Sequence, residues 1–482
     1  MDSKYEAVIG LEVHAQLLTD TKIFCGCSTR FDAPPNTNVC PVCLGHPGVL
    51  PVMNKKVVEF TALMGLATEC AINERSIFAR KNYFYPDLPK GYQISQYEEP
   101  ICEHGKITIE LKDGSMRDIG IIRIHMEEDA GKSIHDQGSE TLIDVNRCGT
   151  PLMEIVSEPD MHTADEAYLY LTKLKQIVTY LGICDGNMEE GSLRCDANIS
   201  IRLKGETKLG TKTEVKNMNS FRNVEKAIEF EIERQIDILE EGGRIVQQTL
   251  LWNADQNKII PMRSKEEAHD YRYFPDPDLM PVIVDQKWKV EISKMMPELP
   301  EKRRDRFIEQ YSLPKYDAEI LTSSRDLADY YEKILTVTDD YKSASNWVMT
   351  EVLKNINDRK ITVAQFPVSA ENLGKLIKMI NENIISGKIA KEIFPEMLST
   401  NSDPNVIVKE KNLVQITDTS EIENVIDGIL SANPKQIEEF LSGKDKVIGF
   451  FVGQIMKETK GKANPAIVNE LLKSKLESKR EK

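Results

Sequence analysis

The opening stretch of the chain, residues 6–17, alternates between apolar and polar positions. Its apolar positions are Ala7, Ile9, Leu11, Val13, Ala15 and Leu17. A period of two predicts a strand buried on one side, which leaves Glu12, His14 and Gln16 on the other. A carboxylate and an imidazole two residues apart point the same way, as two metal ligands or an acid–base pair do. An ordinary solvated face also explains one such pair, so companions elsewhere decide between the two interpretations.

Three later segments, residues 119–127, 193–203 and 212–216, show the same alternation. The first follows residues 107–111 across a Lys-Asp-Gly-Ser turn, which predicts a β-hairpin. Their polar faces mix carboxylates with basic or amide side chains, namely Arg123, His125 and Glu127; Arg194, Asp196 and Asn198; and Lys212, Glu214 and Lys216. Solvent exposure explains any one of these faces, whereas four together favour a single charged sheet surface with a function.

Apolar residues at helical spacing occur in both halves of the chain and dominate the second. In the first half this spacing predicts helices over residues 55–66, 163–181 and 221–239. After a change of composition near residue 297 it continues over 301–311, 325–335, 345–355, 370–383 and 386–394, and a loop at 399–404 precedes a last helical block. We therefore predict an α+β protein with a β-rich domain at residues 1–294, a helical domain at 295–405 and a helical tail at 406–482.

Composition narrows the class of protein. The net charge of −15 argues against broad nonspecific binding of nucleic acid, although lysines gather near the end of the chain and allow a local basic patch. The sequence contains no apolar run of membrane-spanning length and no signal-peptide pattern, which predicts a cytoplasmic protein. In that compartment the nine cysteines are expected to be thiols or metal ligands rather than disulfides.

Four of the nine cysteines fall within nineteen residues, as Cys25, Cys27, Cys40 and Cys43. Two close pairs joined by a loop-forming segment predict a four-thiolate zinc site of the knuckle type, with unligated thiols as the alternative. His46 is the nearest imidazole, and we interpret it as a loop residue because a structural zinc site is complete with four thiolates.

Two further segments carry candidate chemistry. Residues 80–93 concentrate aromatics, prolines and lysines, which indicates either a packed loop or the lining of a site. Gly131-Lys-Ser133 does not form a P-loop because Met126 stands where that motif needs its first glycine. Carboxylates around one cleft suit Mg²⁺ holding nucleotide phosphates, with Lys and Arg neutralising the transferred charge.

Six long motifs, spread in order over essentially the whole chain, resemble a known family. They are G-L-E-V-H-A-Q-L at 10–17, K-N-Y-F-Y-P-D-L-P-K at 81–90, H-M-E-E-D-A-G-K-S at 125–133, G-S-L-R-C-D-A-N at 191–198, D-Y-R-Y-F-P-D-P-D at 270–278 and G-Q-I-M-K-E-T-K-G-K-A-N-P at 453–465. All six look like GatB, the family of B subunits of the aspartyl/glutamyl-tRNA amidotransferase. The archaeal relative GatE carries a large insertion for which this chain has no room.

The resemblance implies a fold and a reaction. It implies an N-terminal cradle domain with an antiparallel sheet, similar to glutamine synthetase and guanido kinases, then a helical domain and a YqeY-like helical tail. Such a protein uses ATP and Mg²⁺ to phosphorylate the side-chain carboxylate of Glu on tRNA(Gln) or Asp on tRNA(Asn). Ammonia then displaces the phosphate. A carboxylate oxygen is a poor leaving group, and its phosphorylation at this site removes that barrier.

The resemblance also assigns roles to residues. Glu12, His14 and Glu127 are expected to bind Mg²⁺ and phosphate, with Glu154, Asp196, Arg194 and Asn198 as further candidates for Mg²⁺, ATP or substrate. Glu127, Glu128 and Lys81 are the expected catalytic residues, and a Lys81–Glu128 pair would end the ammonia route. Cys25, Cys27, Cys40 and Cys43 match a zinc knuckle that some members carry. Lys457, Lys460 and Lys462 would touch tRNA.

The chain lacks an amidase signature, so the resemblance implies that glutamine is hydrolysed by a partner subunit, GatA, with GatC bridging the two. The alternative is a noncatalytic tRNA-binding scaffold for GatA. A scaffold has no need for Glu12, His14 and Glu127 together.

Overall fold

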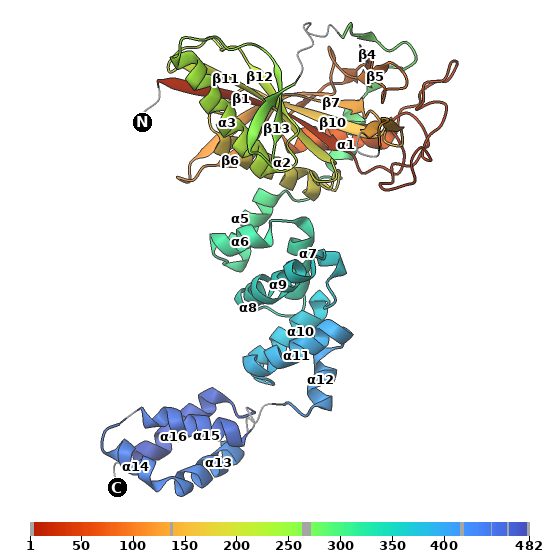
Figure 1. The fold of residues 1–482 in the computed structure, drawn as a ribbon. Helices are drawn as coiled ribbons and strands as arrows, with labels where there is room; N and C mark the ends of the chain where they lie inside the picture. The colour runs from red at the N-terminus through yellow and green to blue at the C-terminus, as the bar shows by residue number, and fades with distance from the viewer. Residues whose placement is uncertain are drawn as a thin grey trace. The chain divides into compact units, whose positions relative to one another are not determined.

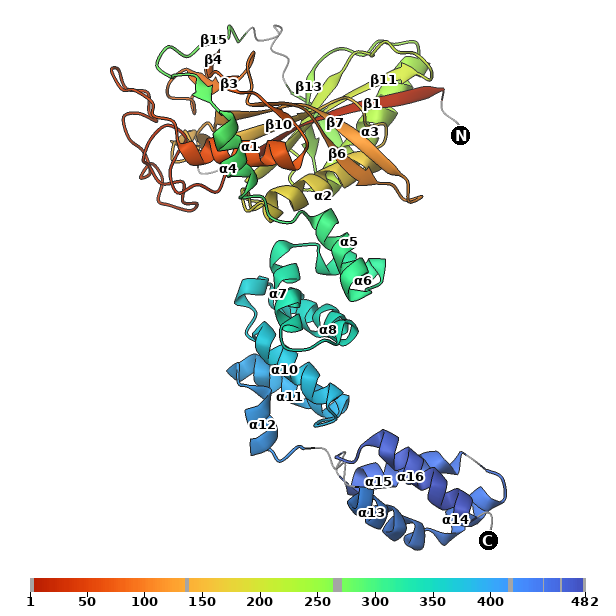
Figure 2. The same cartoon turned by 180° about the vertical axis from the view of Figure 1, so that it is seen from behind.

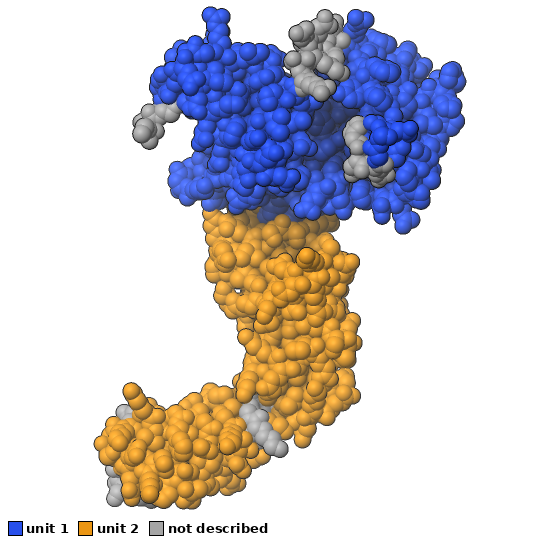
Figure 3. Space-filling view, viewed as in Figure 1, with its two compact units in different colours: residues 1–300 blue, residues 301–482 orange. Residues whose placement is uncertain are grey.

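The structure is a computed structural model that describes residues 4–134, 138–262, 271–414, 419–444, 446–459 and 462–479. It divides into two compact units, residues 1–300 and 301–482 (Figure 3). Every described strand belongs to the first unit, and the described elements of the second are helical. The chain is therefore α+β, and the division falls close to the predicted change of composition.

A nine-stranded sheet forms the centre of the first unit, in the order β14-β13-β12-β11-β1-β10-β7-β6-β2. Its strands are β1 (Tyr5–Gln16), β2 (Ala71–Ile72), β6 (Cys102–Glu110), β7 (Met116–Glu128), β10 (Pro151–Ser157), β11 (Leu193–Leu203), β12 (Thr213–Lys216), β13 (Thr249–Asn253) and β14 (Lys258–Pro261). The segments with alternating polar faces are neighbours as β12, β11, β1 and β7, with β10 inserted between the last two.

One pair in this sheet departs from the expected antiparallel arrangement. Strands β12 and β13 run parallel, whereas every other pair of neighbours is antiparallel. The chain between them contains the long helix α3 (Phe221–Glu240), and a helical crossover returns the chain to the same end of the sheet. The parallel pair is thus a consequence of the predicted amphipathic helix.

Three helices cover the apolar face of the sheet, namely α1 (Lys55–Ala67), α2 (Ala164–Tyr180) and α3 (Figures 1 and 2). Ile9, Leu11 and Val13 of β1 are buried in one hydrophobic core together with residues of all three helices. Thr163 caps α2 by accepting a hydrogen bond from the backbone N–H of Glu166. Burial of the apolar face on this side leaves the polar face to form the site.

Short strands flank the polar end of the large sheet. Strands β4 (Ala79–Asn82), β5 (Tyr92–Ser95) and β15 (Phe274–Pro275) form a small sheet, and the side chain and backbone of β5 contact Glu128 at the end of β7. The remaining pairs are β3 (Arg75–Ser76) with β16 (Val282–Ile283) and β8 (Lys132–Ile134) with β9 (Leu142–Asp144). Lys132 and Ser133 therefore lie in a strand, not in a loop that opens a helix. Helix α4 (Gln286–Ser293) ends this unit.

The second unit contains two separate hydrophobic cores, one spanning residues 307–408 and the other residues 422–476. The helices around the first are α5 (Pro300–Tyr311), α6 (Lys315–Leu321), α7 (Arg325–Leu335), α8 (Tyr341–Trp347), α9 (Leu353–Arg359), α10 (Ala370–Asn381), α11 (Gly387–Thr400) and α12 (Pro404–Glu410). The second core has α13 (Thr419–Ala432), α14 (Pro434–Leu441), α15 (Val447–Glu458) and α16 (Pro465–Ser478).

The helix predicted over 345–355 is confirmed, since α8, a π-helical turn at Val348–Val352 and α9 follow one another without a break. One prediction for these helices needs correction. The predicted loop at 399–404 starts later, since α11 continues to Thr400 and Asn401 ends it with a left-handed conformation. No helix among the described residues is long and apolar enough to cross a membrane.

Candidate active site

The register of the central strands brings polar side chains into one row across the sheet. His14 of β1 lies opposite Glu154 of β10 on one side and Arg194 of β11 on the other. Glu154 in turn lies opposite His125 of β7. Directly opposed residues in antiparallel strands point to the same face, so four segments far apart in the sequence contribute to one surface.

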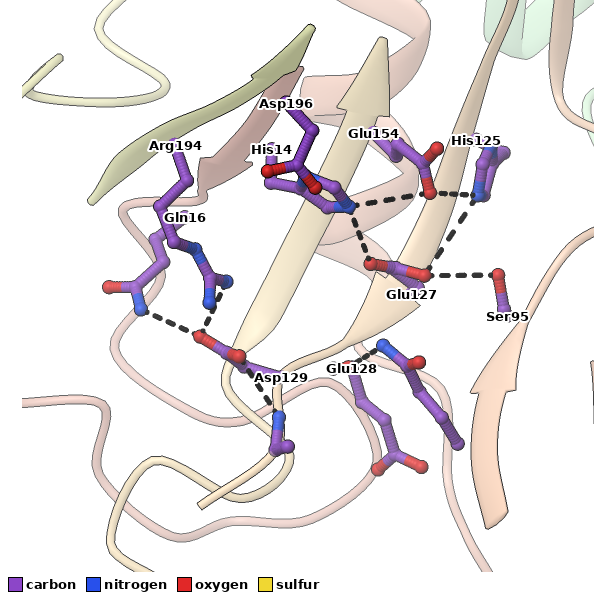
Figure 4. Close-up of polar contacts among 12 residues, drawn as sticks. His14, Gln16, Ser95, His125, Glu127, Glu128, Asp129, Glu154, Arg194 and Asp196 are labelled. Atoms are coloured by element: carbon purple, nitrogen blue, oxygen red, sulfur yellow. Dashed lines mark hydrogen bonds and ion pairs between the residues drawn. The ribbon is translucent and has the colours of Figure 1, made fainter. Parts of the chain in front are cut away.

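The tightest group on this surface consists of His14, Glu127 and Glu154, whose ligand atoms lie within 4.8 Å of one another (Figure 4). The imidazole Nε2 of His14 is 3.5 Å from a carboxylate oxygen of each glutamate. His125 Nε2 lies 3.1 Å from Glu154, and the Ser95 hydroxyl donates to Glu127 over 3.2 Å. Both glutamates are buried. Two buried carboxylates are thus held beside two imidazoles.

The electrostatics of this group are dominated by the two carboxylates. Burial alone would lower the pKa of His14, but hydrogen bonding to Glu154 and the charges of both glutamates raise it to about 9. Burial likewise opposes ionisation of Glu154, yet the two imidazoles hold the pKa of that carboxyl well below its usual range. In the part of the chain that the structure describes, His125 Nδ1 is a buried nitrogen without a hydrogen-bond partner.

The donor set fits a divalent cation. Two carboxylate oxygens suit Mg²⁺, which usually keeps several waters and is bound by one or two carboxylates together with phosphates. An imidazole nitrogen is a more usual ligand for transition metals, so His14 is the least typical member of a magnesium set. The converging ligand atoms of His14, Glu127 and Glu154 give the site a donor set for a cation.

Glu12, expected among the metal ligands, lies outside this group. Its carboxylate accepts a hydrogen bond from the Asn198 amide over 2.9 Å, and its register partner on β11 is Asp196. Lys216 of β12 donates to Asp196 and forms an ion pair with Glu214 at 2.8 Å. The structure thus forms a second charged group on the same face, around Glu12, beside the group that contains Glu154.

A third group, around Asp129, escaped the sequence analysis. Asp129 accepts hydrogen bonds of 2.9 Å from both Gln16 and Arg194 (Figure 4). Arg147 lies 3.4 Å from the same carboxylate. Asp129 follows Glu127 by two residues, so the period of the strand pointed to it as a companion of Glu127. Arg194 is held here and shows where a phosphate or carboxylate could be neutralised.

Lys81 lies beside the carboxylate group. Its ammonium is 5.0 Å from the centre of the Tyr271 ring, and burial opposes its charge. The charges of Glu127 and Glu154, together with the neighbouring tyrosines, outweigh burial and raise the pKa of Lys81. Tyr273 is within the same electrostatic neighbourhood, where burial raises its pKa to about 12. The positively charged side chain of Lys81 therefore lies on the side of β7 that carries Glu127.

Glu128 faces away from this group, and the expected Lys81–Glu128 pair is replaced by another. Lys90 donates to the carboxylate of Glu128, which also accepts a 2.8 Å hydrogen bond from the backbone N–H of Ile94. The physical reason is the alternation of the strand, because β7 stays regular through Glu128 and consecutive side chains point to opposite faces. Lys90 was not predicted as a site residue, and the sequence offered no signal for its pairing.

The four cysteines of the predicted zinc site come together. The ligand sulfurs of Cys25, Cys27, Cys40 and Cys43 lie within 4.8 Å of one another, and Cys40 Sγ is 3.9 Å from Cys43 Sγ. Zinc–thiolate bonds of about 2.3 Å in a tetrahedron place the sulfurs about 3.8 Å apart. The cluster is compatible with structural zinc.

The tail lysines are placed as follows. Lys457 is exposed in the last turn of α15, and Lys462 is half-buried just before α16. Lys460, the third predicted tRNA contact, lies outside the described residues.

Known proteins match the chain along nearly its full length. Residues 7–290 match a family described as the GatB/GatE catalytic domain, and residues 329–476 match one described as the GatB domain. A protein of Chlorobium phaeobacteroides (strain BS1) is 58% identical over 473 residues, 98% of this chain and 99% of that protein. A protein of Geobacter sulfurreducens (strain ATCC 51573 / DSM 12127 / PCA) is 59% identical over 476 residues, which are 98% of this chain and 99% of that protein. Both relatives are named as the B subunit of aspartyl/glutamyl-tRNA(Asn/Gln) amidotransferase.

Proposed function

Because the chain belongs to the GatB family, the B subunits of aspartyl/glutamyl-tRNA(Asn/Gln) amidotransferase, we propose that its polar sheet face is where a misacylated tRNA is activated and amidated. The chain takes part in tRNA-dependent transamidation as one subunit of a ligase that forms C–N bonds. Its substrates are Glu-tRNA(Gln), Asp-tRNA(Asn) or both. The side-chain carboxylate becomes an acyl phosphate at the expense of ATP, and ammonia then displaces phosphate.

The observation that carries this proposal is the buried group of His14, Glu127 and Glu154. Phosphoryl transfer is catalysed mainly by positioning and by neutralising charge, and carboxylate-bound Mg²⁺ is a common means of both. We propose that Glu127 and Glu154 hold Mg²⁺ with ATP, with His14 completing the set. When bound, that ion would neutralise the phosphate oxygens and orient the nucleotide.

The chain's own cations complete the charge balance. Lys81 stands beside Glu127, and Arg194 is held by Asp129 at the end of the same face. We propose that both face the phosphate being transferred. The second group, with Glu12, Asn198 and Asp196, is the proposed place for a further cation or for the aminoacyl end of the tRNA.

Ammonia must reach this face as the free base, because ammonium has no lone pair with which to attack. We propose that Glu128, paired with Lys90 behind the face, lies on the route of ammonia and accepts its surplus proton. Lys81 and Glu127 would then meet the ammonia at the reacting carboxylate. GatA is the proposed source of ammonia and GatC the proposed bridge between the subunits.

The remaining parts of the chain have proposed roles as well. Residues 1–294 form the catalytic cradle with a structural zinc site, 295–405 a helical domain and 406–482 a YqeY-like tail. Lys457, Lys460 and Lys462 of the tail are the proposed tRNA contacts. A noncatalytic scaffold is less favoured, because binding tRNA does not require buried carboxylates beside imidazoles.

A substitution in the assembled complex separates catalysis from scaffolding. Glu127→Gln is given ATP, Mg²⁺, Glu-tRNA(Gln) and free ammonium, which removes the need for glutamine hydrolysis. We expect amide formation and ATP cleavage to fall at least about a hundredfold, with tRNA binding retained. Asp118→Asn is the matched control, because Asp118 is an exposed carboxylate on the same strand. Undiminished amide formation by Glu127→Gln would refute the kinase assignment.

A further inference from the structure

The cysteine cluster and Glu128 lie on opposite walls of one cavity. The cavity has a volume of about 160 Å³. Cys25, Cys43 and His46 line it from the side of the cluster, and Lys90, Tyr92 and Glu128 line it from the side of the sheet. The segment that carries the cysteines is therefore a wall of the space into which the Lys90–Glu128 pair points.

This pair is shielded from solvent. The side chains of Lys90 and Glu128 are 9% and 3% exposed. A buried ion pair is stable only while the two groups stay in contact, because their attraction must offset the hydration that both have lost. Whatever holds the facing wall in place therefore also maintains the environment of this pair.

The wall has little structure of its own. Residues 29–53 contain no strand or helix, and Cys43 is the only one of them that is buried. The segment has no hydrophobic core or strand ladder of its own, and Asn36 and Asn38 tie it to residues 143–146 by hydrogen bonds. A metal crosslink among its cysteines would add to this order. The four sulfurs within 4.8 Å provide the donor set for such a crosslink.

A buried lysine connects the wall to the body of the domain. Lys22 is fully buried, and its ammonium donates to the backbone carbonyl of Asn38 over 2.7 Å and to Cys43 Sγ over 3.6 Å. Gly149, with a φ of +80°, passes close by, since a Cβ there would lie 3.5 Å from Cys43 and 3.9 Å from Glu128. Wall, lysine and Glu128 thus meet around one glycine.

We propose that zinc bound by Cys25, Cys27, Cys40 and Cys43 keeps this wall closed over the Lys90–Glu128 pair, with Lys22 as the residue that positions Cys43. Zinc removal then opens the cavity locally and leaves the sheet intact. The proposal depends on the shared cavity alone, and so it stands or falls separately from the amidotransferase mechanism.

The cysteines allow loss of zinc to be separated from a change in the side chains that line the cavity. Cys25 and Cys43 line the cavity, whereas Cys27 and Cys40 belong to the cluster without lining it. If zinc holds the wall, Cys27→Ser and Cys40→Ser open the cavity although neither changes a lining side chain. Cys184→Ser is the control, because Cys184 is a buried thiol of the same domain outside the cluster and the cavity.

The readout is the rate at which a small amine-reactive acylating reagent modifies Lys90 in the full-length chain, followed by peptide mass spectrometry. Zinc content is measured alongside. We expect the rate to rise at least about tenfold in Cys27→Ser, Cys40→Ser and chelator-stripped wild type, because local opening by about 1.4 kcal/mol has that effect. Lys112, which is 83% exposed, should react equally in all samples, and Cys184→Ser should match wild type.

Three outcomes would overturn the proposal. Lys90 could stay protected in zinc-free Cys27→Ser, the wild type could contain no zinc while Lys90 is protected, or stripping of zinc could unfold the whole first unit. The last is detected by hydrogen exchange of β1 and β11 amides in stripped wild type. None of these outcomes bears on whether Glu127→Gln abolishes amide formation.

The role of Lys22 has its own test. The Lys22→Met variant should lose zinc to a competing chelator faster than wild type. The rate for Lys22→Arg should lie between the two, because arginine keeps a donor to Cys43. Equal zinc transfer by Lys22→Met and wild type would remove Lys22 from the proposal.

Discussion

Buried glutamates occur on both sides of the large sheet, and their hydrogen bonding differs between the two sides. On the helix-covered face, Glu231 of α3 is fully buried and accepts hydrogen bonds from Thr213 at 2.7 Å, Gln235 at 2.8 Å and both ends of the Arg234 guanidinium. On the polar face, Glu127 and Glu154 share their surroundings with each other, and their contacts with His14 are 3.5 Å long.

The difference distinguishes a structural carboxylate from one kept for a ligand. Both oxygens of Glu231 have short bonds, and a single guanidinium balances its charge, so nothing further is needed there. Glu127 and Glu154 place two negative charges together, and apart from the contacts with Ser95 and His125 at 3.2 and 3.1 Å their contacts are long. A divalent cation would stabilise this arrangement. Burial alone does not separate the two cases, whereas the completeness of the hydrogen bonds does.

The largest effect is expected from Glu154→Gln on catalysis. Loss of one cation-binding charge should reduce ATP-dependent amide formation about a hundredfold or more. The free energy of unfolding should fall by only about 1 kcal/mol, because the lost contacts with His125 and His14 are offset in part by removal of the repulsion from Glu127. Rates with saturating ATP and denaturant unfolding curves measure the two quantities. A strongly destabilised but active variant would put Glu154 in the same class as Glu231.

Glu231→Gln should show the reverse. We expect the free energy of unfolding to fall by about 3 kcal/mol, because Arg234 and Thr213 lose their partner in the interior. The rate of amide formation, measured well below the unfolding transition, should match wild type. Arg234→Lys serves as the control, since it keeps the charge and loses the two-bond geometry, and its loss of stability should be smaller.

The pH dependence of stability should come from the polar face. The folded-state pKa of His14 is raised to about 9, so its proton binds the folded chain more tightly than the unfolded one. Its contribution is complete below the unfolded pKa of about 6.5 and is lost as the pH rises through about 9. In chelator we expect a decline of roughly 3 kcal/mol over that range, absent in His14→Gln. An equal decline in His14→Gln would assign it elsewhere.

Mg²⁺ should stabilise the polar face alone. A cation that binds only the folded chain raises the free energy of unfolding by about 1 kcal/mol at a few times its dissociation constant. We expect this increment in wild type and in Glu231→Gln, and its loss in Glu154→Gln. Thermal unfolding with and without Mg²⁺ makes the measurement, and an increment that persists in Glu154→Gln would place the cation elsewhere.

Much of the charged face was predictable from strand periodicity. The alternation of β1, β7 and β11 placed His14, Glu127 and Arg194 on polar faces, and the structure joins those faces. The position of Glu154 was harder to predict because every residue of β10 is buried and the strand lacks alternation. A central strand covered on both faces conceals the side that its one carboxylate occupies.

Pairings between segments were beyond the sequence. Periodicity indicated that Glu128 points away from Glu127, yet it could not show that Lys90 would meet it, since that contact depends on how the small sheet lies against β7. The parallel pair of β12 and β13 was missed for a similar reason, because strand order and direction follow from tertiary packing around α3.

The central position of β1 has a consequence for synthesis of the chain. This strand leaves the ribosome before both of its neighbours, since His14 pairs with Glu154 and Arg194, which are 140 and 180 residues further along. At translation rates of about 5–20 residues per second, β1 waits roughly 10 to 40 s for both neighbours. Over that time its apolar face and unpaired backbone are open to mispairing, so the strand that carries His14 benefits from protection by chaperones.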